Sequence, residues 1–257
     1  MPIVMDRRRL VAGLAAGSVV AFTGGCAQNT ALGRKQLLLV DDAQLAQLSA
    51  ASWKQIREKE KISRDPELNA RVRRVGQRIA AASGLPRRDW EFTVFDSDAV
   101  NAFVLPGGKV GFYRGILELM ANDDQVATVM GHEFAHLAGR HSAERYSQQL
   151  ASNSALQVTD VVLASNDVQF AREISAVLGA GVTFGVILPY SRRHEYEADR
   201  IGMGYMAKAG YDLDQAVAFW EKMAARSKGS RPEFASTHPS DQNRIRAIRE
   251  EIGRIRA

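Results

Sequence analysis

Apolar and polar positions along the main part of the chain predict helices on either side of a small sheet. Residues 41–61 carry apolar side chains at helical spacing behind Asp41 or Asp42, either of which can cap the helix. Residues 66–84 repeat the pattern, and Pro66 suits the first turn of that helix. The inward face of this second helix is predicted to consist of Val72, Val75 and Ile79.

Strands are predicted in the stretch that follows. Residues 91–95 are rich in aromatic and β-branched side chains, which is typical of strands. Residues 99–104 and 109–113 flank the turn sequence Pro106-Gly107-Gly108, so a strand–turn–strand unit is expected. Together with the helices, these strands predict an α+β fold that is mainly helical.

More helices are predicted after the sheet. Asn122 and the two acidic residues behind it can cap a helix whose apolar pattern continues to about Gln149. Residues 211–225 predict another helix and residues 229–239 a loop. The last helix carries an apolar stripe, expected to pack on the core, that consists of Ile245, Ile248, Ile252 and Ile255.

The helix that begins near Asn122 contains the run His132-Glu133-Phe134-Ala135-His136. Histidines at positions i and i+4 lie on one helix face, about 5–6 Å apart at Cβ, so both imidazoles can reach one metal ion. Glu133 lies beside that face, where it can act on a water molecule without binding the metal. The motif alone is only suggestive, and a metal site needs a third ligand.

His141 is one candidate for the third ligand. The long pattern H-E-x-x-H-x-x-G-x-x-H requires its last histidine at position 142, where this chain has Ser142. Because His141 stands one residue too early, we expect it to be a polar histidine on the helix surface.

Glu195 is the stronger candidate. Glu195 and Asp199 are four residues apart and share a helix face, so Glu195 can complete a His₂Glu site. Asp199 can then accept the remaining ring N–H of a ligating histidine. Glu197 points roughly 200° away from Glu195 around the helix. The alternative for these carboxylates is a solvated acidic face, which the upstream histidine motif disfavours.

Four motifs occur in a characteristic order: Asn101-Ala102-Phe103-Val104-Leu105-Pro106-Gly107-Gly108, then H-E-F-A-H, then S-R-R-H-E-Y-E-A-D-R-I-G, then S-T-H-P-S. From about Gln36 to its C-terminus the chain resembles peptidase family M48. The resemblance implies a zincin-like (gluzincin) domain with a small sheet beside the H-E-x-x-H helix. It also implies His132, His136 and Glu195 as ligands of one zinc ion, and Glu133 as the general base.

The H-P motif of the family falls on His238, so the resemblance places this histidine near the zinc. His238 is expected either to stabilise the oxyanion of the tetrahedral intermediate or to occupy the open metal position in a latent state. The alternative is a loop histidine that caps the helix starting near Ser240.

Zincin-type enzymes bind an extended peptide against an exposed sheet edge. By resemblance, this role falls to Asn101, Ala102, Phe103 and Val104. The alternative is an ordinary strand in which Phe103 packs into the core.

Residues 152–188 are apolar and rich in small side chains, but polar and charged residues interrupt them. The uninterrupted runs of about 15 residues are shorter than the ~20 residues that a membrane-spanning helix needs. We therefore expect two amphipathic helices that cover the site, in the manner of a lid.

The N-terminal 25 residues have the features of an export signal. Three arginines precede an apolar run from Leu10 to Phe22, which is too short to span a membrane. Thr23-Gly24-Gly25-Cys26 resembles a bacterial lipobox, and Cys26, the only cysteine, stands where the lipid would be attached. We expect residues 1–25 to be a signal peptide, residues 26–40 a tether and residues 41–257 the peptidase domain. An uncleaved anchor remains the alternative, and the arginines leave the export route open between the general secretory and twin-arginine pathways.

Composition narrows the function further. A formal net charge of +5 is mild, and the basic residues are spread out without interleaved aromatic residues, so we expect no nucleic-acid partner. A single cysteine excludes an intrachain disulfide.

The predicted function is a zinc endopeptidase that is lipid-anchored in a bacterial cell envelope, facing the periplasm and sorted to the outer membrane. The resemblance implies unfolded or misassembled envelope proteins as its substrates. The rival hypotheses are a zinc-bound chaperone or assembly factor with little proteolytic activity, and a non-catalytic scaffold. Retention of Glu133 argues against the first, because a structural metal site needs no base, and the occurrence of three motifs in the right order argues against the second.

Overall fold

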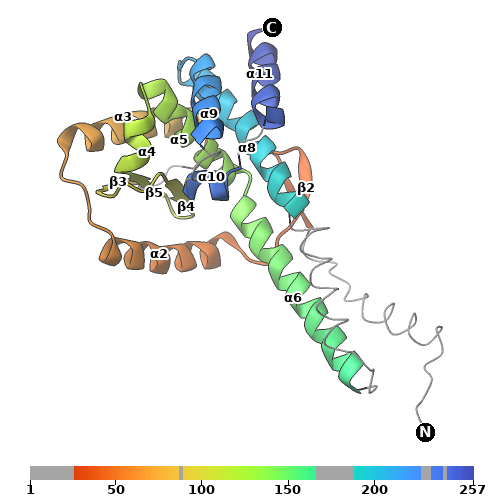
Figure 1. Ribbon diagram of the computed structural model, residues 1–257. Helices are drawn as coiled ribbons and strands as arrows, with labels where there is room; N and C mark the ends of the chain where they lie inside the picture. Colours follow the sequence, from red (N-terminus) through yellow and green to blue (C-terminus); the bar gives the residue numbers. More distant parts are fainter. Residues whose placement is uncertain (1–25, 87–88, 166–187, 227–232, 240–241) are drawn as a thin grey trace. The chain divides into compact units, whose positions relative to one another are not determined.

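The computed structural model describes residues 26–86, 89–165, 188–226, 233–239 and 242–257 (Figure 1). The chain divides into two compact units. The first unit comprises residues 1–40 and 143–192, and the second comprises residues 41–142 and 193–257. The predicted signal peptide lies outside the described residues, and so does most of the predicted pair of amphipathic helices, at residues 166–187.

In the first unit, the segment expected to be a tether contains a β-hairpin. Strands β1 (Cys26–Asn29) and β2 (Arg34–Leu37) pair antiparallel, with Cys26 exposed. Arg34 donates two hydrogen bonds, of 2.7 and 2.8 Å, to the carboxylate of Glu144, which also accepts a 2.7 Å hydrogen bond from Gln36 Nε2. These contacts attach the hairpin to helix α6 (His141–Ser165). Residues 26–40 are therefore more ordered than a tether.

The second unit is built around a three-stranded sheet with the order β3-β5-β4. Strand β3 (Glu91–Phe95) runs parallel to β5 (Lys109–Tyr113), and β4 (Ala102–Leu105) runs antiparallel to β5. The predicted strands are thus confirmed, and the predicted turn joins β4 to β5. Gly107 and Gly108 adopt φ values of 91° and 85° there, a backbone region that favours glycine.

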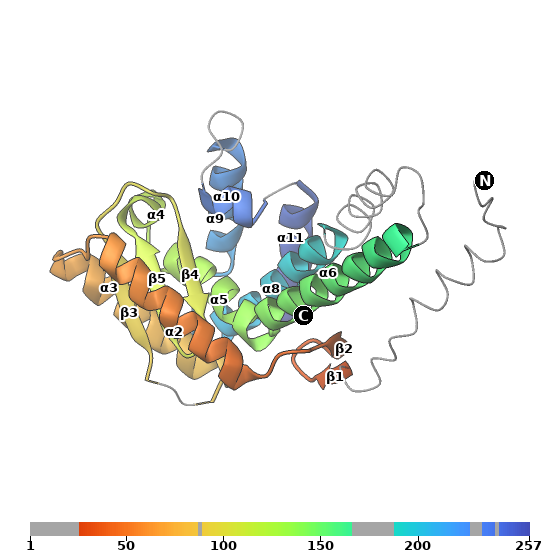
Figure 2. The same ribbon diagram turned by 90° about the horizontal axis from the view of Figure 1, so that it is seen from below.

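Helices cover both faces of this sheet, and the predicted mainly helical α+β class is confirmed (Figures 1 and 2). Side chains alternate between the two faces of a strand. On one face, Trp53 of α2 packs edge-on against Phe95 and Phe103. On the other face, Val94 and Phe112 are buried in the core shared with α3 and α5. The helices concerned are α2 (Asp42–Lys59), α3 (Pro66–Ser83) and α5 (Asp123–Ala138).

The helix caps follow the sequence signals. Asp41 forms a capping box with Gln44 at the start of α2, and Asn122 caps α5. Gly84 ends α3 in the left-handed conformation, with φ at 65°. The remaining helices are α4 (Arg114–Leu119), α8 (Leu188–Lys208), α9 (Asp214–Arg226), α10 (Glu233–Thr237) and α11 (Gln242–Arg256).

Two further sequence expectations, both about secondary structure, differ from the structure. The helix expected to continue to about Gln149 ends at Ala138, because Gly139 and Arg140 form a turn in which Arg140 has a φ of 51° before α6 begins. The loop expected at residues 229–239 contains the short helix α10. The isoleucine stripe of α11 packs on the core as predicted.

Among the described residues, no helix combines the length and the apolar character that crossing a membrane requires.

Candidate metal centre

Helices α5 and α8 cross in backbone contact at two glycines. A Cβ atom on Gly131 would lie 3.0 Å from the carbonyl oxygen of Gly202, and a Cβ on Gly202 would lie 3.0 Å from the backbone of Gly131 and His132. Larger side chains would separate the helices. This close crossing brings the His132 side of α5 near the Glu195 and Asp199 side of α8, although over sixty residues separate them in the sequence.

Three predicted ligands converge at this crossing. The Nε2 atoms of His132 and His136 are 3.0 Å apart. Glu195 places its carboxylate oxygens 3.3 Å from His132 Nε2 and 3.4 Å from His136 Nε2. Metal–ligand distances of about 2.0–2.1 Å in a tetrahedral site require ligand atoms to be roughly 3.3 Å apart. The three atoms therefore fit one zinc-sized ion.

His238 brings a fourth atom into the same space. Its Nδ1 lies 3.1 Å from His132 Nε2 and 3.0 Å from a Glu195 oxygen, and all four side chains belong to one group with metal-binding spacing. The imidazole is held by α10, because the backbone N–H of His238 donates to the Phe234 carbonyl and the two rings lie 4.7 Å apart. The structure thus brings His238 into the centre.

Asp199 has the position predicted for it. It lies 2.9 Å from Nδ1 of His132, opposite the nitrogen that faces the other ligands. Arg244, on α11, donates to Asp199 through two nitrogens and lies 3.0 Å from a Glu195 oxygen. The guanidinium stacks on Trp220 of α9, 3.9 Å from the ring centroid. Arg244 therefore orients a ligand carboxylate and the carboxylate behind another ligand.

The protonation states of His136 and Glu195 suit metal binding, whereas His132 must lose a proton to bind a metal. Burial holds the pKa of His136 well below its ordinary value, so the neutral imidazole retains a nitrogen lone pair. Burial opposes ionisation of Glu195, but the charges of His238 and Arg244 outweigh it and keep the pKa of this carboxyl well below its ordinary value. Burial and Arg244 oppose protonation of His132, yet hydrogen bonds to Asp199 and Glu195 raise its pKa to about 9.

Glu133 lies between the ligands and the sheet edge. Its side chain is buried, and burial raises the pKa of its carboxyl, which makes the carboxylate a better proton acceptor. Among the described residues, Glu133 Oε1 has no hydrogen bond of good geometry, although His238 Nε2 is 3.3 Å away. A buried carboxylate oxygen in this state, beside a metal-sized gap, fits an acid–base role towards water or substrate.

Strand β4 passes beside Glu133 as an edge strand of the described sheet. Tyr113 N donates to Asn101 O, and hydrogen-bonded pairs recur every second residue along an antiparallel pair. The backbone groups of Ala102 and Val104 therefore point away from β5. The backbone of Val104 hydrogen-bonds to Glu133. Phe103 instead points to the opposite face, where it contacts Trp53.

The prediction for His141 was wrong. Its side chain is not at the surface but 1% exposed, and it contacts His136 rather than joining the four-residue group. Helix spacing suggested a surface position because the predicted helix did not break at Gly139. The sequence pattern also did not predict the Gly131–Gly202 contact or the packing of Arg244 on Trp220. The one sequence signal for the role of Arg244 is its position shortly after His238-Pro239.

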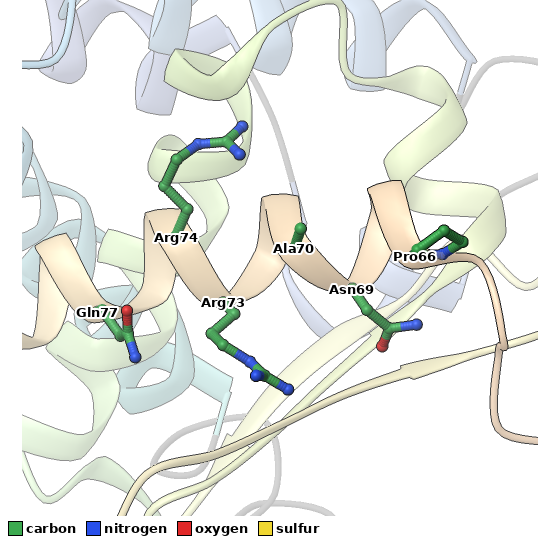
Figure 3. Close-up of a pocket in the computed structure, with 6 residues that line it drawn as sticks. All are labelled: Pro66, Asn69, Ala70, Arg73, Arg74 and Gln77. Atoms are coloured by element: carbon green, nitrogen blue, oxygen red, sulfur yellow. The ribbon is translucent and has the colours of Figure 1, made fainter.

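A second hollow of the structure does not compete with this centre (Figure 3). Its lining side chains all come from α3, and they are Pro66, Asn69, Ala70, Arg73, Arg74 and Gln77. This set contains no metal-ligating or nucleophilic group.

Histidines at i and i+4, a glutamate from a crossing helix and a second buried glutamate beside a sheet edge are the arrangement of metal-dependent peptidases. The second unit thus has the fold and the site of a metallopeptidase domain. Comparison with known families makes the class specific: the pattern described as "Peptidase family M48" matches residues 66–252, and the chain belongs to this family.

Similar proteins come from mitochondria and from bacteria. The chain is 42% identical over 181 residues to the mitochondrial metalloendopeptidase OMA1 of Schizosaccharomyces pombe, covering 70% of this chain and 51% of the relative. The corresponding protein of Saccharomyces cerevisiae is 38% identical over 164 residues, 61% of this chain and 45% of the relative. The β-barrel assembly-enhancing protease of Escherichia coli K12 is 28% identical over 208 residues, 79% of this chain and 42% of the relative. The chain therefore spans about half the length of these relatives.

Proposed function

We propose that this chain is a zinc-dependent endopeptidase of the cell envelope that degrades misfolded or misassembled proteins. The observation that carries the proposal is the convergence of His132 Nε2, His136 Nε2 and the Glu195 carboxylate at 3.0–3.4 Å, with Glu133 beside them. Two imidazoles and one carboxylate are a donor set that zinc favours, and one zinc ion per chain fits their spacing.

Zinc in this position would act as a Lewis acid that polarises the scissile carbonyl and makes a nearby water more acidic. Glu133 accepts the proton of the attacking water and passes it to the leaving amine, which its raised pKa favours. Asp199 accepts a hydrogen bond from Nδ1–H of His132, so that Nε2 would face the metal. Arg244 holds both Asp199 and Glu195 in place.

The edge of β4 supplies the binding mode for an unfolded chain. The outward carbonyl groups of Ala102 and Val104 can pair with an extended peptide, whereas their N–H groups donate to Asn101 Oδ1 and to Glu133. This pairing requires no particular side chain from the substrate. Because Val104 lies beside Glu133, the paired peptide would run past the proposed base. An unfolded polypeptide of varied sequence suits such a site better than a single small molecule.

His238 is proposed to occupy the fourth ligand position in a latent form of the enzyme. Its Nδ1 stands at ligand spacing from both His132 and Glu195, which supports the latent role over the oxyanion role. When the loop that carries it moves away, the position becomes available to water and substrate.

The site of action is proposed from the N-terminal sequence. A short apolar run behind three arginines, followed by Cys26, supports export and lipid attachment at an outer membrane. The exposure of Cys26 is compatible with such an anchor. The similarity to the β-barrel assembly-enhancing protease of E. coli supports misassembled envelope proteins as substrates. Membrane fractionation of Cys26→Ser should show release of the protein or loss of its processing, and an unlipidated wild type would contradict the anchor.

The decisive test is digestion of a chemically unfolded protein by the purified chain. Cleavage should require zinc, stop with a chelator and return when zinc is added. Glu133→Gln should abolish cleavage yet retain about one zinc per chain, because the amide cannot accept the proton and is not a ligand.

Glu221→Gln is the matched control, since it removes an exposed carboxylate that is paired with Arg249 and does not belong to the metal-binding group. Each protein is also assayed in a version that carries the additional substitution His238→Ala, so that a latent state cannot conceal its activity. Zinc-dependent cleavage by Glu133→Gln contradicts the assignment of the base. A zinc-loaded wild type that prevents aggregation but never cleaves would favour the chaperone hypothesis.

A further inference from the structure

His141 lies directly behind a proposed metal ligand. The Nε2 atom of His136 faces the metal position, 3.0 Å from His132 Nε2, and its other nitrogen, Nδ1, lies 2.8 Å from Nδ1 of His141. The imidazole of His141 is 1% exposed. Its Nε2 lies 3.2 Å from Glu197, whose other oxygen accepts a 2.8 Å hydrogen bond from Arg193. Four side chains thus form a row leading away from the centre.

A metal bound to His136 Nε2 would set the direction of every hydrogen bond in this row. A ligating nitrogen has no proton, and a neutral imidazole has one, so His136 carries its proton on Nδ1 and donates it to His141 Nδ1. A neutral His141 then carries its own proton on Nε2 and donates to the Glu197 carboxylate. His132 reaches its carboxylate, Asp199, directly, whereas His136 reaches Glu197 through one intervening imidazole.

The same residues could instead hold a second metal ion, since ligand atoms of His141, His194 and Glu197 lie within 4.8 Å of one another. Ring orientation argues against this. The rings of His141 and His194 are stacked, 4.2 Å apart and inclined by 10°, whereas those of His132 and His136 are inclined by 82°. A metal lies near the plane of each imidazole that binds it, and two parallel rings at stacking distance share no such point.

We propose that His141 and Glu197 are positioning residues of the metal centre, which hold His136 in the tautomer and orientation that presents Nε2 to the metal. This inference rests on the proposed function, because it takes His136 to be a ligand. Outer partners of ligating histidines typically change metal affinity by about 10–100-fold when they are removed.

Gly139 explains why His141 can reach this position. A Cβ atom on Gly139 would lie 2.4 Å from His141 Nε2 and 2.8 Å from two ring carbons. Gly139 has a φ of −70°, which any residue adopts, so the need for glycine here is one of space and not of backbone conformation. Gly139→Ala would therefore displace the imidazole without altering any hydrogen-bonding group.

The experiment measures zinc affinity by competition with a chromogenic chelator, zinc content per chain, and the visible spectrum of the cobalt-substituted protein. His141→Phe keeps an aromatic ring but removes the acceptor, so zinc affinity should fall about 10–100-fold and the cobalt bands should shift. His141→Asn places an amide oxygen near the former Nδ1 and should restore part of the affinity. Glu197→Gln should weaken binding less than His141→Phe does.

Two glycine variants form a matched pair in which no proposed ligand and no residue of the row is replaced. Gly139→Ala should lower zinc affinity in the same direction as His141→Phe. Gly204→Ala, on α8, should leave it at the wild-type value, because a Cβ there meets no atom within 4 Å. This pair keeps the test decisive if His141→Phe fails to fold.

Several outcomes would overturn the inference. Unchanged affinity and unchanged cobalt spectra in both His141→Phe and Gly139→Ala would leave His141 as a packing residue. Two zinc ions per wild-type chain, falling to one in His141→Phe, would show a second metal site instead. A wild type that binds no zinc would overturn the proposed function together with this inference. If the wild type binds zinc and cleaves, the proposed function stands, and unchanged zinc affinity in the variants would then overturn only the inference about His141.

Discussion

The two ring nitrogens of His238 face different parts of the proposed centre. Nδ1 stands at ligand distance from His132 and Glu195, while Nε2 lies 3.3 Å from the proposed base, Glu133. In the proposed centre, this one side chain would therefore fill the fourth ligand position and restrict access to the base. Its attachment to the short helix α10, through Phe234, means that movement of a small segment would clear both positions.

Substitution of His238 by alanine distinguishes its two candidate roles by the sign of the effect. If His238 blocks the metal, basal cleavage of an unfolded substrate should rise, because a ligand that competes with water is removed. If it stabilises the transition state, kcat should fall with little change in KM. Steady-state kinetics with the zinc-loaded protein measure this. Phe234→Leu, which alters the packing behind His238 and leaves its imidazole, should act in the same direction but less strongly.

At the scale of elements, the metal centre depends on how closely α5 and α8 approach each other. Gly131 and Gly202 bring the two backbones so close that a Cβ atom on either glycine would lie 3.0 Å from the backbone of the other helix. The distances between ligands on the two helices, 3.3 and 3.4 Å, follow from that approach. A change at the crossing should therefore alter metal binding without touching any ligand.

Gly202→Ala tests this dependence. The added methyl group must push α8 away by a few tenths of an ångström, since it meets backbone atoms that cannot rotate aside. Zinc affinity should fall, whereas Gly204→Ala two residues further along the same helix should bind zinc like the wild type. Chelator competition measures both. Equal affinities for the two variants would show that the crossing tolerates more space than the structure indicates.

Also at the scale of elements, Glu91 links helix α2 to the sheet. It accepts hydrogen bonds from Trp53 and Arg57 of α2 and from Lys109 of β5, at 2.8–3.1 Å. Burial alone would raise its pKa, but the hydrogen bonds from Lys109 and Trp53 outweigh burial and hold the pKa below the ordinary value of 4.5. The ionised form is therefore stabilised by folding.

The sign of the pH effect follows from that lowered pKa. The contribution of Glu91 to the free energy of unfolding is complete above about pH 4.5 and is lost as the pH falls through the lower folded-state pKa. Glu91→Gln should therefore be less stable than wild type at pH 7, and the difference should shrink on acidification below pH 4.5. Urea denaturation at several pH values measures this. Glu58→Gln, an exposed position on α2, is the control.

At the scale of the whole molecule, the centre gathers segments that are distant in the sequence. Its side chains come from α5, α8, the end of α10 and α11, all within the second unit. Bound metal should therefore stabilise the unit as a whole, because each segment contributes a ligand or the residue that orients one.

Metal removal should lower the thermal stability of the protein. A ligand present at 100 times its Kd stabilises the folded state by about 2.7 kcal/mol, which corresponds to roughly 5–10 °C in Tm for a chain of this size. Differential scanning calorimetry with zinc and with a chelator measures the shift. Glu195→Ala should show no zinc-dependent shift, and an equal shift in this variant would place the stabilising metal elsewhere.

The spacing of residues along single helices was enough to predict much of the proposed centre. His132 and His136, and likewise Glu195 and Asp199, are four residues apart on helices, so the helix repeat alone brings each pair to one face. The sequence also predicted the helix caps at Asp41 and Asn122 and the strand–turn–strand unit around Gly107 and Gly108. Caps and turns are predictable because they depend on neighbouring residues. The sequence therefore determined the class of fold and which side chains of the proposed centre share a helix face.

Tertiary structure decided what depends on residues meeting across long separations. The contact of Gly131 with Gly202, the position of His238 at the fourth ligand position and the stacking of Arg244 on Trp220 arise only when α5, α8, α9 and α11 pack together. The break at Gly139 and Arg140, which turns His141 inward, is also a packing outcome, since a helix pattern continues through it. No periodicity within one segment encodes such contacts, because their free energy comes from the partner segment.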